Sequence, residues 1–437
     1  MERVLARDVL KSVGQQVLVR GWLHKKRLLG GLTFINIRDR SGLVQVTVQN
    51  KDEVEKLRGL QIGTVLSVVG TATEEPRAPG GAELREPTIA IDVPVHDEPP
   101  IEIDKPLSHK SDNLDTLFDT RVIGLRNLRE AAIFKIQAEV EESIRQYLKE
   151  HDFTQFNSPK LLPGATEGGA EVFKLDYFGK QATLAQSAQF YKQILVGVYE
   201  RVFEINPTYR AEPSATTRHM TEFITIDMEM GFTTLPELLD LLSNLVGSVV
   251  NDVWSKREAE LKLWEATKPV LAAKFPVLTM AEIHEKYTES TGTSTVGEKD
   301  LRPDEERWVC DYAARKLGSE AIFVTDWPAS EAKFYHKINE QKPEFAERFD
   351  LLFRGVEIAT GSMREHRYDA LVKQLQEKTG GKPDDPGFEY FLQAFRHGMP
   401  PHGGFGMGLE RLSEKIIGLH NVKEATLFPR DINRLAP

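Results

Sequence analysis

The sequence predicts an α+β protein with a small N-terminal β-barrel and a larger domain in which helices flank an antiparallel sheet. Three observations lead to this fold class. Several short strand-like runs fill about the first hundred residues, and a stretch rich in proline and charge follows at 95–125. Strands then outnumber the helices that could cross between them, which disfavours a doubly wound parallel sheet.

The N-terminal runs alternate polar and apolar residues, which is the pattern of half-buried strands. They lie at 16–24, 33–38, 43–48, 64–71 and 87–93. The sequence Asp39-Arg40-Ser41-Gly42 has turn chemistry and predicts a hairpin between the second and third runs. Five such strands fit an oligonucleotide-binding (OB) barrel, but strand count alone also fits other small β domains.

Residues 95–125 show little periodicity, so we predict a hinge there. The expected domains are therefore a barrel at 1–100, a hinge at 101–125 and a catalytic domain at 126–437. A chain of 437 residues is long enough for this arrangement.

The second domain opens with apolar residues at helical spacing from Ile133 to Tyr147, and Thr234 with Pro236 marks the start of a second helix. The segment 255–320 has a helical pattern. A glycine-rich strand and a closing helix follow near the end of the chain. Further strands are expected at 153–162 (broken by Pro159), 183–186, 201–206, 222–232, 321–325 and 349–360.

Composition limits the class of protein. No apolar run is long enough to span a bilayer, and the single Cys310 excludes internal disulfides and paired-cysteine zinc sites. We expect a cytoplasmic protein without membrane association. The net charge of −10 argues mildly against nucleic-acid binding, although local charge decides such contacts. For the basic run Lys25, Lys26 and Arg27, the sequence favours a solvated loop.

Two neighbouring segments carry residues suited to a nucleotide. Arg210 could grip a phosphate with its planar fork and Glu212 could bind an adenine amino group, although a surface ion pair is the commoner use of such residues. Arg218 and His219 could contact a triphosphate tail, and Phe223 could stack on a base. A solvated Arg, a hydrogen-bonded His and a core Phe are the structural alternatives.

The segment Gly404-Phe405-Gly406-Met407-Gly408 places three glycines on one face of a strand. A flat ligand could lie against such a bare face, with Arg411 at the start of the next helix facing phosphate. A tightly packed, bulged strand is the alternative.

Asp350 and Glu357 lie seven residues apart in one strand-like stretch. This spacing would place them on opposite faces unless Arg354-Gly355 forms a bend or bulge. Two carboxylates beside a triphosphate would suit Mg²⁺, which takes few protein ligands.

Taken together, these pieces resemble the three signature motifs of class II aminoacyl-tRNA synthetases. The helix at 132–150 with Pro159 resembles motif 1, which forms the dimer interface in that family. Tyr209-Arg210-Ala211-Glu212 through Asp227 resembles motif 2, and the segment 404–411 resembles motif 3. The barrel and hinge fit subclass IIb, so the resemblance covers nearly the whole chain.

Within the subclass the chain most resembles archaeal-type aspartyl enzymes, through segments such as 166–173, 186–193, 349–358 and 397–406. The resemblance implies that Lys192 and Arg364 bind the side-chain carboxylate of L-aspartate. It assigns Asp227 to the substrate ammonium. Other implied aspartate ligands are Glu167, Gln189 and Thr360.

The resemblance also assigns the ATP site. Arg210 would bind the α-phosphate, with Glu212 and Phe223 on adenine. The distal phosphates would meet His219 and Arg411, helped by Arg218. Further implied contacts are Gly408 and Glu357 to ATP, and Asp350, Glu357 and Thr360 to Mg²⁺.

In the barrel, the resemblance places Phe34 and Gln45 on anticodon bases. His24 and Pro79 match enzymes that charge both tRNA-Asp and tRNA-Asn. It therefore implies a homodimeric aspartate–tRNA ligase of the non-discriminating kind, with a tRNA-dependent amidotransferase downstream if tRNA-Asn is charged. The rivals are an asparaginyl-tRNA synthetase, a synthetase-derived asparagine synthetase and a non-catalytic tRNA-binding paralogue.

Overall fold

The computed structural model describes residues 1–29, 32–107, 109, 114–164, 171–211, 213, 219–385 and 387–437. The chain divides into two compact units, Met1–Ala131 (joined by Pro437) and Ala132–Ala436, and each unit has its own hydrophobic core. Within the described residues, we find no helix with the length and hydrophobicity needed to span a bilayer.

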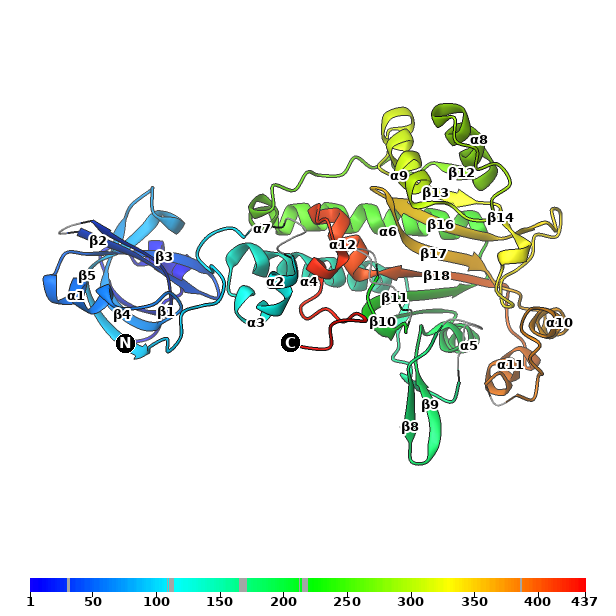
Figure 1. Cartoon of the computed structure of the whole chain (residues 1–437), viewed down its shortest axis with the longest axis horizontal. Coiled ribbons are helices and arrows are strands. Elements are labelled where there is room, and N and C mark those ends of the chain that lie inside the picture. Colours follow the sequence, from blue (N-terminus) through cyan, green and yellow to red (C-terminus); the bar gives the residue numbers. More distant parts are fainter. Residues whose placement is uncertain are drawn as a thin grey trace. The chain divides into compact units, whose positions relative to one another are not determined.

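The first unit contains a closed barrel with the strand order β1-β2-β3-β5-β4 (Figure 1). Its strands are β1 (Gln16–Leu29), β2 (Leu32–Asp39), β3 (Gly42–Val48), β4 (Val65–Glu74) and β5 (Ala82–Val93). Every second residue of β2 is buried, as the alternation predicted. Asp39 pairs with Gly42, so the predicted hairpin is confirmed. The sequence analysis missed helix α1 (Lys51–Arg58), which begins where Asn50 accepts two backbone N–H bonds.

The segment 95–125 is more ordered than predicted, because its second half forms helices α2 (Leu114–Asp119) and α3 (Arg121–Gly124). Arg121 and Glu130 form a fully buried ion pair there, with 3.1 Å between Nη1 and Oε2. The sequence analysis did not predict these helices, since helices this short give almost no periodic signal.

The second unit is built on an eight-stranded sheet with the order β12-β13-β16-β17-β18-β11-β10-β6. The prediction of an antiparallel sheet is confirmed for the six central strands, whereas the edge strands β12 and β6 pair in parallel. The strands are β6 (Thr154–Gln155), β10 (Arg201–Tyr209), β11 (Glu222–Gly231), β12 (Val277–Thr279), β13 (Ala321–Thr325), β16 (Arg348–Phe353), β17 (Val356–Met363) and β18 (His402–Gly408).

Helices α4 (Leu128–Glu150), α6 (Leu235–Lys256) and α12 (Leu409–Ile417) bury their apolar residues in one cluster with one face of this sheet. Thr234 and Glu237 form a capping box that begins α6, as the sequence predicted. The remaining helices are α5 (Gln189–Tyr199), α7 (Glu258–Leu263), α8 (Met280–Thr291), α9 (Pro303–Tyr312), α10 (Tyr368–Thr379) and α11 (Glu389–Arg396). Short helical turns lie at Ala6–Ser12, Pro79–Gly81, Ala313–Leu317, Ala329–Glu331 and Val422–Ala425.

A projecting hairpin, β8 (Lys174–Tyr177) and β9 (Lys180–Leu184), joins β7 (Leu161–Leu162) in a small separate sheet (Figure 1). The short strands β14 (Trp327–Pro328) and β15 (Phe345–Ala346) pair with each other. The single strand expected at 153–162 is wrong, because only the two-residue strands β6 and β7 form there.

The single strand expected at 349–360 is also wrong. Strands β16 and β17 form a hairpin whose two-residue turn, Arg354-Gly355, has φ values of 47° and 83°. Positive φ at both turn residues matches the twist of an antiparallel pair. The run Phe349–Phe353 is apolar except at Asp350 and carries apolar residues on both faces, so periodicity could not mark the reversal.

The close approach of β17 to its neighbours can be tested at Gly361. A Cβ there would lie 2.4 Å from Cζ of Phe349 and 2.7 Å from the carbonyl oxygen of Gly404. We expect Gly361→Ala to lower the free energy of unfolding by about 1–3 kcal/mol, measured by urea denaturation. As a control, Gly247→Ala in α6 meets nothing within 4 Å and should raise stability by up to about 1 kcal/mol. Equal effects at the two sites would contradict this account.

Candidate active site

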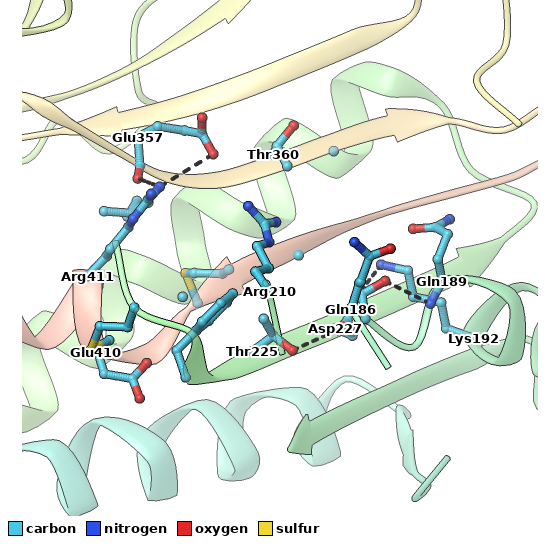
Figure 2. Close-up of a pocket in the computed structure, with 18 of the residues that line it drawn as sticks. Gln186, Gln189, Lys192, Arg210, Thr225, Asp227, Glu357, Thr360, Glu410 and Arg411 are labelled. Atoms are coloured by element: carbon cyan, nitrogen blue, oxygen red, sulfur yellow. Dashed lines mark hydrogen bonds and ion pairs between the residues drawn. The ribbon is translucent and has the colours of Figure 1, made fainter. Parts of the chain in front are cut away.

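A cavity of about 1050 Å³, including its open mouth, lies over the sheet face opposite the α6 core. Strands β11, β17 and β18 and helix α5 supply much of its lining. In Figure 2, Gln186, Lys192 and Asp227 gather at one end, and Glu357 with Arg411 lies at the other. This size accommodates a nucleotide and a small second substrate together.

Strand alternation explains which side chains reach the cavity. Ile226 and Met228 of β11 point into the core, so Asp227 and Glu229 point to the other face. Strand β18 lies between β11 and β17. Its register aligns two rows across the three strands, Asp227–Gly406–Thr360 and Glu229–Gly404–Ser362. The glycines thus form a floor between two strands that carry side chains.

The three glycines do not have the same role. A Cβ on Gly404 would lie 2.0 Å from the Met228 carbonyl oxygen and 2.3 Å from Oε2 of Glu229. On Gly406 the nearest atom would be 3.6 Å away, and on Gly408 it would be 3.7 Å away. The tightly packed alternative therefore describes Gly404, whereas Gly406 and Gly408 form the open floor of the cavity.

The two cations singled out by the sequence, Lys192 and Arg364, line this one cavity. Lys192 is 1% exposed; its Nζ donates to Oδ1 of Asp227 at 2.8 Å and to the Phe405 carbonyl oxygen at 3.0 Å. Helix α5 places Gln189 and Lys192 one turn apart on the same face. The sequence analysis did not predict this helix.

Arg364 forms a two-point ion pair with Glu229, which the sequence analysis missed. Nε donates to Oε1 at 2.8 Å and Nη2 to Oε2 at 3.1 Å. Oε2 of Glu229 also lies 3.7 Å from the Lys192 ammonium, so this carboxylate lies between both cations. Strand period could have found it, because Glu229 follows Asp227 by two residues on the same strand face.

This group of four charges is internally balanced. Burial alone would raise the pKa of Asp227, but the Lys192 ammonium and hydrogen bonds from Lys192 and Thr225 lower it below its usual value. Burial alone would lower the pKa of Arg364, and Glu229 raises it above its usual value. Both shifts favour the charged forms of Asp227 and Arg364, and the ion pairs balance two basic with two acidic side chains in the interior.

Glutamine side chains at the same end have unsatisfied polar atoms. Among the described residues, Nε2 and Oε1 of Gln186 and Nε2 of Gln189 are buried without hydrogen-bond partners. Both residues line the cavity. Buried amide groups normally find partners, so these atoms fit a site that a polar ligand completes. Gln186 was absent from the sequence-based site.

The opposite end carries the residues expected at a nucleotide. The Arg210 guanidinium lies 5.5 Å from the centre of the Phe223 ring. Nη1 of Arg411 donates to the Glu357 carbonyl oxygen at 2.8 Å and lies 3.8 Å from Oε1 of the same residue. His219 also lines the cavity. The structure thus places these five residues around one cavity.

The Arg354-Gly355 turn brings Asp350 and Glu357 onto neighbouring strands. Burial raises the pKa of Asp350 to about 7, with Arg348 lowering it and Glu357 raising it further. Arg348 donates to Oδ2 of Asp350 at 3.0 Å, and Thr360 also hydrogen-bonds the Asp350 carboxylate. Burial and the neighbouring Glu357 disfavour the charged form of Asp350 despite Arg348, so a bound cation would stabilise that form.

Three of the expected site residues, Glu167, Glu212 and Arg218, lie outside the described residues. Within the part of the chain that the structure describes, no group of three or more His, Cys, Asp or Glu could hold a metal ion. That result disfavours a protein-only metal cage but not a site completed by phosphate oxygens and water.

A second cavity, the barrel groove, contains Phe34, Gln45 and Pro79. Glu83, which the sequence analysis missed, accepts from Gln45 Nε2 at 2.9 Å and from Thr47 Oγ1 at 2.7 Å. Glu83 therefore fixes the orientation of the Gln45 amide. The amide oxygen points away from Glu83 and can act as a hydrogen-bond acceptor. The groove also carries the cations Lys25, Arg27, Arg77 and Arg85.

His24 does not line the barrel groove. It lies at a bulge between Leu23 and Lys25, is 7% exposed, and has a pKa lowered by burial and by Arg38. The solvated loop favoured for Lys25, Lys26 and Arg27 is wrong, because β1 extends to Leu29. Lys26 instead donates to carbonyl oxygens at the end of α1.

The chain joins a five-stranded OB barrel to a mainly antiparallel sheet with a glycine-floored cavity. This combination defines a class II tRNA synthetase. Residues 17–92 match the family described as OB-fold nucleic acid binding domain. Residues 113–432 match tRNA synthetases class II (D, K and N), and the chain belongs to this family.

The chain is similar in sequence or structure to three proteins from this family. It is 40% identical to the aspartate–tRNA(Asp/Asn) ligase of Thermus thermophilus over 100% of both chains. It is 40% identical to the aspartate–tRNA(Asp) ligase of Pyrococcus abyssi over 97% of each. The crystal structure of asparaginyl-tRNA synthetase from Pyrococcus horikoshii with asparaginyl-adenylate is 31% identical, covers 100% of both chains and has a TM-score of 0.92. Overall similarity therefore includes relatives named for either amino acid.

The balanced charge group can be tested at Glu229. We expect Glu229→Gln to lower the free energy of unfolding by about 3 kcal/mol, because it leaves the buried Arg364 guanidinium without a counter-charge. Urea denaturation measures the change. Glu258→Gln removes an exposed partner of Lys262 on α7 and should leave the unfolding midpoint unchanged. If the Glu229→Gln protein is as stable as the control, the Glu229 carboxylate is not needed to balance the buried charges.

Proposed function

We propose that this chain is an aspartate–tRNA ligase that activates L-aspartate with ATP and transfers it to tRNA-Asp and tRNA-Asn. The proposal rests on one observation. Two buried cations, Lys192 and Arg364, lie at the end of a glycine-floored cavity, with a carboxylate, Asp227, beside the first of them. Aspartate presents a matching set of one ammonium and two carboxylates.

Charge exchange explains how the pocket could accept a second carboxylate. The substrate ammonium would pair with Asp227 and release Lys192 for the side-chain carboxylate. Arg364 uses four of its five N–H groups on Glu229, Ser362 and the Gly404 carbonyl oxygen. One Nη1–H then remains for the substrate, in a geometry that Glu229 fixes. Gln186 and Gln189 would complete the pocket, and Glu167 and Thr360 belong to the same proposed set.

ATP would occupy the other end of the cavity. Phe223 would stack on adenine, and Arg210 would bind the α-phosphate bidentately. His219, Arg218 and Arg411 would meet the distal phosphates. Gly406 and Gly408 leave room for the nucleotide against the sheet, and Glu212 would bind the adenine amino group.

Asp350, Glu357 and Thr360 would hold Mg²⁺. Asp350 is buried, and burial together with the nearby Glu357 raises its pKa to about 7, so a bound cation would stabilise its charged form. Bound Mg²⁺ would neutralise charge on the phosphate oxygens. Arg348 would orient Asp350, since it donates to that carboxylate at 3.0 Å.

The reaction needs no protein nucleophile. The aspartate α-carboxylate attacks the α-phosphorus of ATP, and the bond to pyrophosphate breaks as the acyl–phosphate bond forms. A terminal ribose hydroxyl of tRNA then attacks the acyl carbon, releasing AMP and a proton. The protein contributes by aligning the two substrates and by placing Arg210 against the charge that develops on phosphate.

The barrel groove would hold the anticodon. Phe34 would stack on a base, and Gln45, fixed by Glu83, would present its amide oxygen as an acceptor. The dual choice of tRNA is supported by the family resemblance at His24 and Pro79, of which only Pro79 lines the groove, and by the Thermus thermophilus relative. Four further points stay predictions. They are homodimer formation, a downstream amidotransferase, a cytoplasmic location and the domain limits 1–100, 101–125 and 126–437.

Asparagine is the second candidate substrate, because Asp227 and Glu229 cancel the charge of Lys192 and Arg364. A synthetase-derived asparagine synthetase is less well supported, since it has no need of the barrel groove. Pyrophosphate exchange with aspartate or asparagine, and a product assay with ammonia, separate these candidates from one another and from an inactive tRNA-binding paralogue.

Arg210→Ala should lower aspartate-dependent ATP–pyrophosphate exchange by roughly 100- to 1000-fold, the usual loss when one charge-stabilising group is removed. Arg315→Ala, at an exposed arginine of the second unit, is the control and should leave exchange unchanged. Near-normal exchange in the Arg210→Ala protein would refute its role on the α-phosphate.

Aspartylation of two transcripts tests the choice of tRNA. We expect the purified protein to charge both tRNA-Asp and tRNA-Asn with aspartate. The double substitution His24→Trp with Pro79→Lys should reduce charging of tRNA-Asn by at least about tenfold and leave tRNA-Asp charging within about twofold, because single base changes are typically worth such factors. Charging of tRNA-Asp alone by the unaltered protein would overturn the dual specificity.

A further inference from the structure

His336 lines the same cavity as Lys192 and Arg364, but neither the motifs nor the proposed function uses it. It lies on the segment between the Ala329–Glu331 turn and β15. Its backbone forms an isolated antiparallel bridge with Arg364, and the residue is only 8% exposed. The neighbouring Tyr335 ring has its centre 5.6 Å from the Arg364 guanidinium carbon. His336 therefore lies at the amino-acid end of the cavity.

Hydrogen bonds define which ring nitrogen of His336 carries the proton. The backbone N–H of Lys333 donates to Nδ1 at 3.3 Å, so Nδ1 is the acceptor and Nε2 carries hydrogen. The backbone is held as well, because its carbonyl oxygen accepts from Gln374 Nε2 at 3.0 Å. Within the described part of the chain, the Nε2–H has no hydrogen-bond acceptor.

The surroundings keep this imidazole neutral. Burial is the main cause that lowers its pKa well below the usual value, and Arg364, Arg348, Lys333 and Lys378 lower it further. All four charged neighbours are cations. His336 thus offers one fixed, uncharged N–H donor beside a group of cations.

Lys192 and Arg364 do not supply enough N–H donors to fill all the acceptor positions of a substrate carboxylate. Once the substrate ammonium has released Lys192 from Asp227, Lys192 offers two of its three N–H groups and Arg364 offers one of five. These supply about three donors, whereas an ionised carboxylate has roughly four acceptor positions. A neutral donor can add a hydrogen bond there without the cost of burying another positive charge.

We propose that the Nε2–H of His336 donates a hydrogen bond to the side-chain carboxylate of bound aspartate and is a specificity determinant against asparagine. The inference rests on the proposed aspartate–tRNA ligase activity. An asparagine amide accepts hydrogen bonds only through its oxygen, and its NH2 group is a donor. With asparagine bound, at least one N–H group of His336, Lys192 or Arg364 would therefore face the amide NH2 and lose its acceptor.

Two substitutions at His336 separate the hydrogen bond from the shape of the ring. His336→Phe keeps a planar ring and removes the donor, whereas His336→Gln places an amide N–H near the former Nε2. The readouts are KM for aspartate, KM for ATP and the aspartate-to-asparagine preference in pyrophosphate exchange. His397→Phe, at an exposed histidine after α11, is the control.

We expect His336→Phe to raise KM for aspartate by roughly tenfold to a hundredfold, the range for losing a hydrogen bond to a charged group. KM for ATP should stay within about twofold. His336→Gln should recover most of the loss, and the aspartate preference should fall in the Phe protein alone. His397→Phe should match the unaltered protein throughout.

Other outcomes overturn the inference. An unchanged KM for aspartate in His336→Phe, an equal rise in KM for ATP, or equal losses in the Phe and Gln proteins would each do so. If thermal melting indicates that the Phe protein does not fold, His336→Ala replaces it in the comparison with Gln. Absence of aspartate-dependent exchange in the unaltered protein would instead refute the proposed function itself.

Discussion

The active-site end of the second unit depends on an ion pair that crosses a glycine. Arg364 and Glu229 meet with contacts of 2.8 and 3.1 Å over Gly404, where any Cβ would lie 2.3 Å from the Glu229 carboxylate. A buried pair of this kind is stable only if both partners are present and well aligned. Glu229 also lies 3.7 Å from Lys192, so one carboxylate faces both cations.

This arrangement follows from the alternation of side chains between the two faces of each strand. One face of β11 supplies Ile226 and Met228 to the core beneath α6, and the other face supplies Asp227 and Glu229. Strand β18 inserts glycines between these acids and the polar residues of β17. The same backbone therefore provides a rigid apolar support, an open floor for a flat ligand and a charged wall at one end.

Much of this could be predicted from the sequence. Period-two runs located the five barrel strands, and the motif resemblance pointed to Lys192, Asp227 and Arg364, which the structure places in one cavity. The missed features involve contacts that sequence spacing does not encode. The role of Glu229 depends on register across three strands, and the histidine tautomer at His336 depends on a backbone N–H three residues earlier. The Arg354-Gly355 reversal was hidden because it follows a run that is apolar except at Asp350, with apolar residues on both faces.

The internal balance of the four charges has a consequence for which small anions the pocket would admit. Lys192 is held by Asp227 at 2.8 Å, and only a group that offers Asp227 a replacement cation can release it. A dicarboxylate without an amino group, such as succinate or malate, brings no such cation and would add negative charge to a neutral interior. The protein's own carboxylates would therefore exclude the abundant metabolic acids that share the aspartate side chain.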